Sequence, residues 1–361
     1  MRIAVLGGGN GAYAAAADLS AQGHEVRFWR RDAAALRQLR AAGAVTLRDG
    51  GGERRVPIAL VAADPGEALR GAEIVFLPDP AFAQLDSARR LAPHLADGQV
   101  VLLAPGTFGS FVMARELREA GARADLAFAE SGTLPWLTRK HGPTTPAITA
   151  RATRLPTGVF PARRHAEAFE RVRAAFPAAE PVEDALSAAL MNAGPVIHPP
   201  LVLMNAGPLE HFERWDIHNE GTQPSIRRVT DALDAERIAA RVALGYAAPH
   251  FPLADHYRAD GAEWMYGRRA HPKLTGSSDW REAIALTTHR YMREDVELGL
   301  AFLVSVCDWA GVACPVARGL LALGSAVLGR DLRAEGRTLE NLGLAGMSPG
   351  ALRQLLRAGF E

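Results

Sequence analysis

Lysine and cysteine are both rare in this chain of 361 residues. Lys140 and Lys273 are the only lysines, so chemistry that depends on a catalytic lysine has two candidates. Cys307 and Cys314 are the only cysteines, which is too few for a disulfide framework. We expect both thiols to be reduced and structural, in a cytoplasmic protein.

An excess of charge of one sign is missing as well, and so are long apolar runs. Lysine plus arginine total 41 and aspartate plus glutamate total 40, a net charge of +1 with both signs scattered. This balance predicts neither a nucleic-acid partner nor a membrane-surface partner. No apolar run approaches the ~20 residues of a membrane-spanning helix. We also expect no signal peptide, because its removal would destroy the first predicted strand.

What the chain does have is a strand–turn–helix–strand pattern at its start. The apolar run at residues 3–6 predicts a buried parallel strand, and a glycine-rich turn follows it. Residues 11–21 predict a helix that Gly23 ends, and residues 24–29 predict a second strand. A turn in this context is typical of a dinucleotide-binding βαβ unit.

The turn itself has the G-x-G-x-x-(G/A) spacing. Gly7, Gly9 and Ala12 hold the three fixed positions, with Asn10 and Gly11 between them. Gly7 permits the tight turn, Gly9 lets the backbone approach a pyrophosphate, and Ala12 packs the helix on the strand. The diphosphate would lie at the helix N-terminus, against free N–H groups. We therefore predict that these five residues bind NAD or NADP.

The end of the second predicted strand bears on the choice between the two cofactors. An acid there usually holds the ribose 2′-hydroxyl of NAD, whereas an arginine accommodates the 2′-phosphate of NADP. Arg30 and Arg31 stand at this place, which favours NADP and leaves NAD possible. Alternatively, an arginine stacks on the adenine or lies in solvent. Asp32 either caps the next helix, predicted at residues 33–41, or reaches the ribose.

The order of predicted elements gives the fold class. Strands and helices alternate in the first half, and only helices follow residue 185, which predicts an α/β fold with an N-terminal Rossmann-type doubly wound sheet and an all-α C-terminal domain. The domains are expected at residues 1–185 and 186–361, with the ligand cleft between them. The further strands are predicted at residues 73–77, 100–103 and 126–129, with a hairpin at 45–60 and added strands within 142–161. The later helices are predicted at residues 185–193, 234–244, 295–310, 315–328 and 348–358.

Several motifs follow one another from residue 1 to about residue 315. They are the glycine turn, Pro105-Gly106, ESGTLP at 130–135, NAGPVIHPP at 192–200, LDAER at 233–237 and HRYMREDV at 289–296. In this order they resemble the octopine/nopaline dehydrogenase family, the opine dehydrogenases. The resemblance implies a Rossmann domain followed by a helical domain. It also implies reductive condensation of an amino acid with a 2-keto acid, driven by NAD(P)H, to give a secondary amine dicarboxylate.

The chain departs from the family pattern at three places. Gln84 stands where a histidine is expected, and Ser131 and Gly132 stand where a Thr-Asn pair is frequent. The arginine pair after the second strand differs from the family members that use NADH. These differences bear on the substrate and the cofactor rather than on the type of reaction.

The chemistry predicts three groups in the helical half. His198 is the candidate acid/base, because histidine titrates near neutral pH, and it matches the catalytic histidine that the resemblance implies. Asp295 is its candidate partner, which would fix the tautomer, and Arg290 is the candidate carboxylate clamp. Arg290 and Asp295 are five positions apart, and on one α-helix side chains at this separation point ~140° away from each other. Both can therefore face one cleft only if the helix begins between them. The alternatives are a helix cap for Asp295 and a surface arginine for Arg290.

Other candidates have weaker support. Asn192 either hydrogen-bonds the nicotinamide or substrate, or caps a helix, and Thr133 follows a strand at the edge where α/β sheets bind ligands. Trp136, Trp264 and Tyr266 either line the amino-acid pocket or belong to the core. No metal site is predicted, because the following histidines lack ligand spacing and cysteine support: His211, His218, His250 and His256.

Two other functions remain open at this point. One is a hydroxyacid dehydrogenase of the ketopantoate or glycerol-phosphate type, whose proton transfer would fall to Lys140 or Lys273. The other is an NADP-binding protein without catalytic activity, against which the set His198, Arg290 and Asp295 argues. The sequence is compatible with a monomer and with a homodimer, and it does not rank the amino acids or the keto acids.

Overall fold

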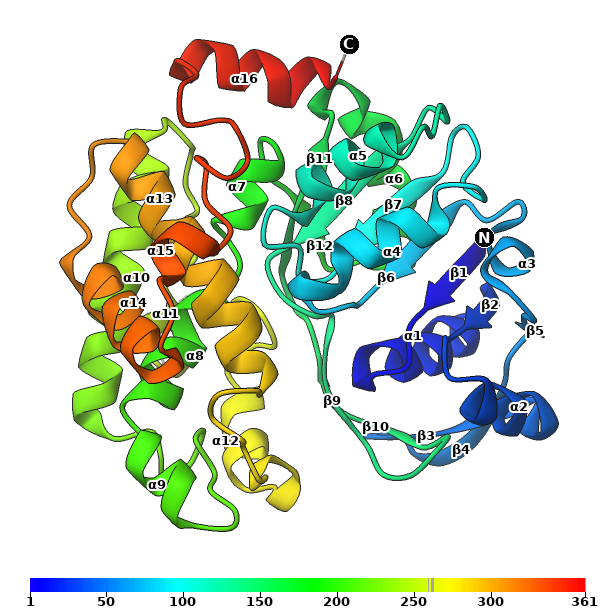
Figure 1. Cartoon of the computed structure of the whole chain (residues 1–361). Coiled ribbons are helices and arrows are strands. Elements are labelled where there is room, and N and C mark those ends of the chain that lie inside the picture. Colours follow the sequence, from blue (N-terminus) through cyan, green and yellow to red (C-terminus); the bar gives the residue numbers. More distant parts are fainter. Residues whose placement is uncertain (259, 261–262, 361) are drawn as a thin grey trace.

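An eight-stranded sheet forms the N-terminal domain in the computed structural model, which describes residues 1–258, 260 and 263–360 (Figure 1). The strand order is β5–β2–β1–β6–β7–β8–β11–β12, and only the β8–β11 pair is antiparallel. The strands are β1 (Arg2–Leu6), β2 (Glu25–Trp29), β5 (Leu60–Val61), β6 (Ile74–Leu77), β7 (Val100–Leu103), β8 (Ala127–Ser131), β11 (Leu155–Phe160) and β12 (Ala179–Pro181). The five longer predicted strands are thereby confirmed, and the order is that of a Rossmann sheet with a switch point between β1 and β6.

Helices cover both faces of this sheet, so successive strand residues enter two different cores. Ile3 and Val5 pack with α1 and α6, whereas Ala4 and Leu6 pack in the core that contains α4 and α5. The doubly wound arrangement is therefore confirmed. The helices are α1 (Asn10–Ala21), α2 (Ala33–Ala42), α3 (Pro65–Leu69), η1 (Ala81–Ala83), α4 (Gln84–Leu91), α5 (Gly109–Glu119), η2 (Ala162–Arg164) and α6 (His165–Ala175).

A second, four-stranded sheet packs over α1, in the order β4–β3–β10–β9. The predicted polar hairpin provides β3 (Ala44–Asp49) and β4 (Gly52–Pro57), and its antiparallel pairing is confirmed. The other half comes from β9 (Trp136–Lys140) and β10 (Pro146–Arg151). The sequence did not predict β9, which lies between the two domains (Figure 1).

The second half is helical in its described part, with two isolated β-bridges (Figure 1). Helix α10 begins at Pro224 rather than at residue 234, because a proline in the first turn of a helix is a start signal. The predicted helix at 185–193 is shorter, and a second helix begins at Gly194. The helices are α7 (Ala185–Ala189), α8 (Gly194–Leu203), α9 (Ala206–His211), α10 (Pro224–Ala243), α11 (Leu253–Tyr257), α12 (Ala270–Thr275), η3 (Ser278–Trp280), η4 (Tyr291–Leu300), α13 (Ala301–Trp309), α14 (Pro315–Leu328), α15 (Leu332–Glu335) and α16 (Pro349–Ala358).

Element η4 is a π-helix, and Arg290 is its N-cap residue. The helix therefore begins between Arg290 and Asp295, as their spacing required. The i→i+5 hydrogen bonds of a π-helix also bring residues five apart close to one line, whereas an α-helix would separate them. Both features place the two side chains on the same side.

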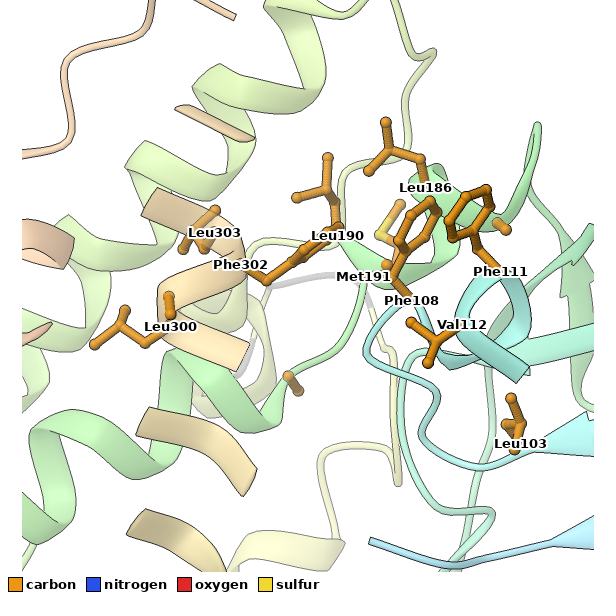
Figure 2. Close-up of a cluster of buried hydrophobic side chains, with 14 of the residues drawn as sticks. Leu103, Phe108, Phe111, Val112, Leu186, Leu190, Met191, Leu300, Phe302 and Leu303 are labelled. Carbon is orange, nitrogen blue, oxygen red and sulfur yellow. The ribbon is translucent and has the colours of Figure 1, made fainter. Parts of the chain in front are cut away.

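The two domains share an apolar interface. Phe108, at the start of α5, stacks on Phe111 at 5.0 Å and on Phe302 of α13 at 5.2 Å between ring centroids. Leu186 and Leu190 belong to the same buried cluster (Figure 2). Because large aromatic rings from both domains are buried against each other, this interface holds the domains in one arrangement.

The ends of the helical half also contact the first domain. Helix α7 packs against β8 and β11, and residue 185, where we placed the domain boundary, is its first residue; that boundary stays a prediction. After α16, the ring of Phe360 lies 5.3 Å from the rings of Phe111 and Phe160. The described part of the helical half therefore returns to the Rossmann domain at Phe360.

The LDAER motif has structural contacts. Arg237 is buried and donates hydrogen bonds to Asp234 and to the backbone carbonyls of Leu190, His250 and Phe251. The motif's glutamate accepts hydrogen bonds from the backbone N–H groups of residues 316 and 317, at the start of α14. The motif therefore ties α10 to α7, α11 and α14.

One apolar stretch has the length and composition of a membrane-spanning helix, contrary to the expectation from the sequence. It is Ala185–Leu203, and 78% of this window is buried inside the protein. A core helix has the same composition, and this stretch forms α7 and α8 beside the interface. Cys307 and Cys314 are likewise buried, as free thiols.

Candidate active site

A cavity of about 790 Å³ lies between the two domains. It opens at the carboxyl ends of β1, β6, β7 and β8, which is where ligands bind in open α/β sheets. The N-terminal domain lines it with Gly9, Asn10, Gly11, Asp79, Pro105, Thr133, Trp136 and Arg139, among others. The helical domain lines it with Asn192, His198, His218, Tyr266, Trp280, Arg290, Tyr291, Glu294 and Asp295, among others.

The N-terminus of α1 enters this cavity without a side-chain cap. Its N-cap residue is Gly9, no acid stands in the first turn, and Gly7 has a φ of 135°. The side chain of Asn10 accepts a hydrogen bond from the backbone N–H of Lys140 and so joins the turn to β9. The first N–H groups of α1 are thus left for an anion, which fits the diphosphate of NAD or NADP.

A second cavity, of about 240 Å³, lies on the other side of the glycine turn. Arg30 lines it and donates a hydrogen bond from Nη1 to the hydroxyl of Tyr13 at 3.1 Å, while its Nε is buried without a partner. Arg31 also lines it, but its side chain is 64% exposed and pairs with Asp86. Asp32 accepts hydrogen bonds from the first turn of α2, so it is a helix cap.

His198 and Asp295 meet in the main cavity. His198 Nδ1 lies 2.8 Å from Asp295 Oδ2, and the ring of Tyr291 stacks on the imidazole at 3.9 Å. A side chain at position 194 would overlap the carboxylate of Asp295, so Gly194 is what lets η4 approach α8 this closely. Since Nδ1 is engaged by Asp295, Nε2 is the ring nitrogen left for a ligand.

Burial and two nearby cations favour the neutral form of the imidazole, and burial also raises the pKa of Asp295 to about 7. Burial lowers the pKa of His198 well below its usual value, and the charges of Arg290 and Arg139 act in the same direction. A neutral imidazole whose Nδ1–H is donated to Asp295 carries a free lone pair on Nε2. The arrangement can therefore accept a proton from a bound molecule.

Arg290 lies at the start of η4 and is exposed to the main cavity. Its guanidinium carbon is 5.4 Å from the centroid of the Tyr291 ring, which in turn stacks on His198. An anion held by this guanidinium would thus lie beside the imidazole. A planar guanidinium binds a carboxylate through two parallel hydrogen bonds.

Two buried acids and a buried arginine support the cavity wall. Glu130 accepts hydrogen bonds from the backbone N–H groups of Phe108 and Ser110, and burial raises its pKa to about 7. Burial also raises the pKa of Glu294 to about 7. Arg337 donates hydrogen bonds to the carbonyls of Thr107 and Ala81, so it links the helical domain to two turns of the sheet.

The weaker candidates have mixed outcomes. Thr133 and Tyr266 line the cavity and lie 3.0 Å apart, Oγ1 to hydroxyl oxygen. Asn192 also lines it, but its amide donates to Thr107 and accepts from the N–H of Gly194. Trp136 lines the cavity, and its indole N–H donates to Asp18.

Of the two alternatives left open for Trp264, the structure favours the core, because this side chain is buried and is not among the residues that line the cavity. Its ring packs 5.6 Å from that of Phe251, and its N–H donates to the carbonyl of Pro252. Trp280, which the sequence analysis did not single out, takes a place in the cavity wall instead. Nothing in the local sequence separates the two tryptophans.

Two further cavity residues were missed. Arg139 comes from β9, a strand that the sequence did not predict. His218 was considered only as a metal ligand, yet its ring lies 6.1 Å from that of His198, and its Nε2 is buried without a hydrogen-bond partner. No group of three potential metal ligands occurs among the residues that the structure describes.

Together, the Rossmann sheet, the uncapped helix at the glycine turn and the interdomain cavity define a two-domain, NAD(P)-dependent dehydrogenase. Comparisons with known proteins specify the family. The model of the NAD/NADP octopine/nopaline dehydrogenase alpha-helical domain matches residues 181–328. The ketopantoate reductase PanE/ApbA model matches residues 3–118.

Known relatives match most of the chain. The opine dehydrogenase of Arthrobacter sp. (strain 1C) is 30% identical over 358 residues, which is 97% of each chain. The vitopine synthase of Allorhizobium ampelinum is 28% identical over 294 residues, 78% of this chain and 77% of its own. This protein belongs to the opine dehydrogenase family and is an NAD(P)-dependent oxidoreductase.

Solved structures show the same fold. Octopine dehydrogenase with NADH and pyruvate has a TM-score of 0.69 at 20% identity, covering 99% of this chain and 98% of its own. Yersinopine dehydrogenase with NADP+ has a TM-score of 0.65 at 18% identity, also covering 99% of this chain and 98% of its own. The predicted resemblance and fold class are thus confirmed.

Proposed function

We propose that this enzyme condenses an amino acid with a 2-keto acid and reduces the product to an N-(carboxyalkyl) amino acid, in a reversible reaction. The observation that carries the proposal is the His198–Asp295 pair beside Arg290, in the cavity that α1 also enters. The family supplies the type of reaction, and this cavity supplies groups suited to its proton transfers and its carboxylates.

The condensation needs a group that moves protons. The amine nitrogen attacks the keto carbon, water leaves, and the resulting protonated imine accepts a hydride at carbon. His198 Nε2 takes a proton from the incoming ammonium group and returns one to the departing hydroxyl. The bound nicotinamide supplies the hydride.

The other residues position these reactants. Asp295 holds the tautomer of His198 and stabilises the imidazolium that forms. Arg290 holds the carboxylate of the keto acid, and Thr133 offers a hydroxyl nearby. Since the amide of Asn192 is engaged by Thr107 and Gly194, it positions the turn before α5 and the start of α8.

We further propose that NADP is the preferred cofactor. Arg30 lines the smaller cavity at the end of β2, where the adenosine ribose lies in Rossmann domains. The Lys140 ammonium lies 4.6 Å from the centroid of the Tyr13 ring, and the hydroxyl of Tyr13 accepts the hydrogen bond of Arg30. Burial and the charge of Arg30 lower the pKa of Lys140. An anion such as the 2′-phosphate would relieve this repulsion between like charges.

The cofactor preference can be tested on the free enzyme. Replacing Arg30 with alanine is expected to raise the Kd for NADPH by about 10- to 100-fold, because a charge-assisted hydrogen bond is lost. The Kd for NADH should change far less, and Lys140→Met should follow the same pattern more weakly. Titration of nicotinamide fluorescence measures both constants. Arg37→Ala, an exposed change on α2, is the control. Equal losses for NADH and NADPH would contradict the assignment.

The reaction itself is tested by cofactor oxidation with purified protein. Pyruvate, glyoxylate, oxaloacetate and 2-oxoglutarate are each combined with each of the twenty amino acids, using NADPH and NADH. Oxidation that requires both partners supports the proposal and identifies the pair. Oxidation with a keto acid alone would overturn it in favour of a hydroxyacid dehydrogenase. Neither Lys140 nor Lys273 is among the residues that line the main cavity, which argues against that reaction.

A further inference from the structure

We propose that Arg139 binds the carboxylate of the amino acid, so that arginines from both domains hold the two carboxylates of the product. This inference rests on the proposed function, because it assigns the second substrate of that reaction to a residue. Arg139 lies on β9 of the N-terminal domain, and Arg290 lies at the start of η4 in the helical domain.

The chemistry of the product requires a second cation. The secondary amine that forms carries a carboxylate on each side, one from each substrate. A carboxylate removed from water is strongly unfavourable unless a charged or hydrogen-bonding partner replaces the lost solvent. When Arg290 holds one carboxylate through two parallel hydrogen bonds, its fork is occupied, and the other carboxylate needs a second donor.

Arg139 is placed to be that partner. Its side chain is 19% exposed, and its guanidinium carbon lies 3.7 Å from the centroid of the Trp280 ring. One edge is held by Glu282, with Nη2 2.9 Å from Oε1. A guanidinium that lies flat on an aromatic ring keeps its remaining N–H groups at its edge. Arg139 Nε donates to the carbonyl of Asp279 at 3.4 Å, so the Nη1 side of the guanidinium is what remains for a ligand in the cavity.

The charge of Arg139 also reaches the reacting region. Arg139 and Arg290 are the two cations whose charges lower the pKa of His198, so both act on the same imidazole. Two guanidinium groups that act on one acid/base from two domains match a substrate with a carboxylate on either side of the reacting atoms.

The other arginines of the cavity are less suited to this role. The guanidinium of Arg227 stacks on Tyr257 at 4.6 Å, and its Nη2 lies 3.3 Å from a ring nitrogen of His271. Arg258 is 61% exposed and pairs with Asp260. Neither of them contributes to the pKa shift of His198.

The proposal has a consequence for selectivity. An amine without a carboxylate would leave the N–H groups of Arg139 that Glu282 and Asp279 do not bind without a ligand, so the enzyme should discriminate against simple amines. A site built to hydrogen-bond one group of a substrate discriminates strongly against an analogue that lacks this group, because buried polar groups of the protein are then left unpaired.

Binding of two small probes tests the proposal without turnover. Iminodiacetate has a carboxylate on each side of a secondary amine, whereas N-methylglycine has only one. With the NADP+-loaded enzyme, calorimetry is expected to give a Kd for iminodiacetate about 10- to 100-fold lower than that for N-methylglycine. In Arg139→Met, that ratio should fall to near one. Arg139→Lys should recover part of it, because it keeps the charge and loses the fork.

The control and the contradicting outcomes are equally specific. Arg281→Met changes an exposed arginine beside Trp280 that pairs with Glu220, and it should keep the wild-type ratio. A ratio near one in the wild type would overturn the proposal. So would an equal loss of affinity for both probes in Arg139→Met and Arg139→Lys, because that result indicates a structural role for Arg139. If the wild type oxidises NAD(P)H with a keto acid alone, the proposed function fails, whereas the probe ratio reports on Arg139 separately.

Discussion

Replacing His198 with glutamine is expected to lower kcat for the condensation by about 10²- to 10⁴-fold, the usual contribution of a general acid/base. Glutamine keeps a polar side chain of similar reach but cannot exchange a proton at neutral pH. The Kd for NADPH should stay unchanged, because the cofactor turn lies on the other domain. Steady-state kinetics with the substrate pair found in the oxidation panel, together with nicotinamide fluorescence, measure the two quantities.

The partner residue gives this prediction a second test. Asp295→Asn should also lower kcat, and the double variant should be little worse than His198→Gln alone, because residues that act as a unit are not additive. His94→Gln, at an exposed position, is the matched control. Retention of near-wild-type kcat in His198→Gln would show that another group moves the protons, and His218, whose ring lies 6.1 Å from that of His198, is the next candidate.

Replacing Arg237 with methionine is expected to lower the free energy of unfolding by about 3–5 kcal/mol, the usual effect of breaking a buried ion pair. Arg237 Nε lies 2.6 Å from Asp234 Oδ1, and both side chains are at most 5% exposed. The change would leave a buried carboxylate without its partner and three backbone carbonyls without their donor. The denaturant midpoint, at unchanged slope, measures the loss.

The same helix offers a control for this variant. Arg228 is exposed on α10, so Arg228→Met should change stability by no more than about 0.5 kcal/mol. If Arg237→Met were as stable as Arg228→Met, the hydrogen bonds of Arg237 would not be what stabilises the packing of α10 against α7 and α11. The double variant Asp234→Asn/Arg237→Met separates the two causes of the loss. If it is more stable than Arg237→Met alone, the unpaired charge of Asp234 is the main cause of the lost stability.

The strands and the cofactor turn were predictable because their signals are local. A central parallel strand is buried on both faces, so β6 and β7 are continuous apolar runs in the sequence. The glycine turn has a fixed spacing, because the backbone geometry of a βαβ unit allows few residues there. Strand β9 was missed because its residues, WLTRK, alternate too briefly to predict a strand.

The candidate site was predictable only in part. His198, Arg290 and Asp295 were found through motifs that resemble a family, and the spacing of the last two required a helix to begin between them. The choice between Trp264 and Trp280 depends on which ring the loops of the helical domain turn toward the cavity. Asp32 was left open as a cap or a ribose ligand, and the start of α2 decided for the cap.

By itself, the sequence determined the order of the elements, the dinucleotide turn and the residue types available for acid/base and carboxylate chemistry. Each of these features can be recognised from short local segments of the chain. The tertiary structure decided which of these residues meet. His198 and Asp295 are 97 positions apart, and only the close approach of η4 to α8 at Gly194 joins them. Arg139 reaches the same cavity from a strand of the other domain. Contacts of this kind depend on how two domains pack, and packing is set by the whole chain rather than by any one segment.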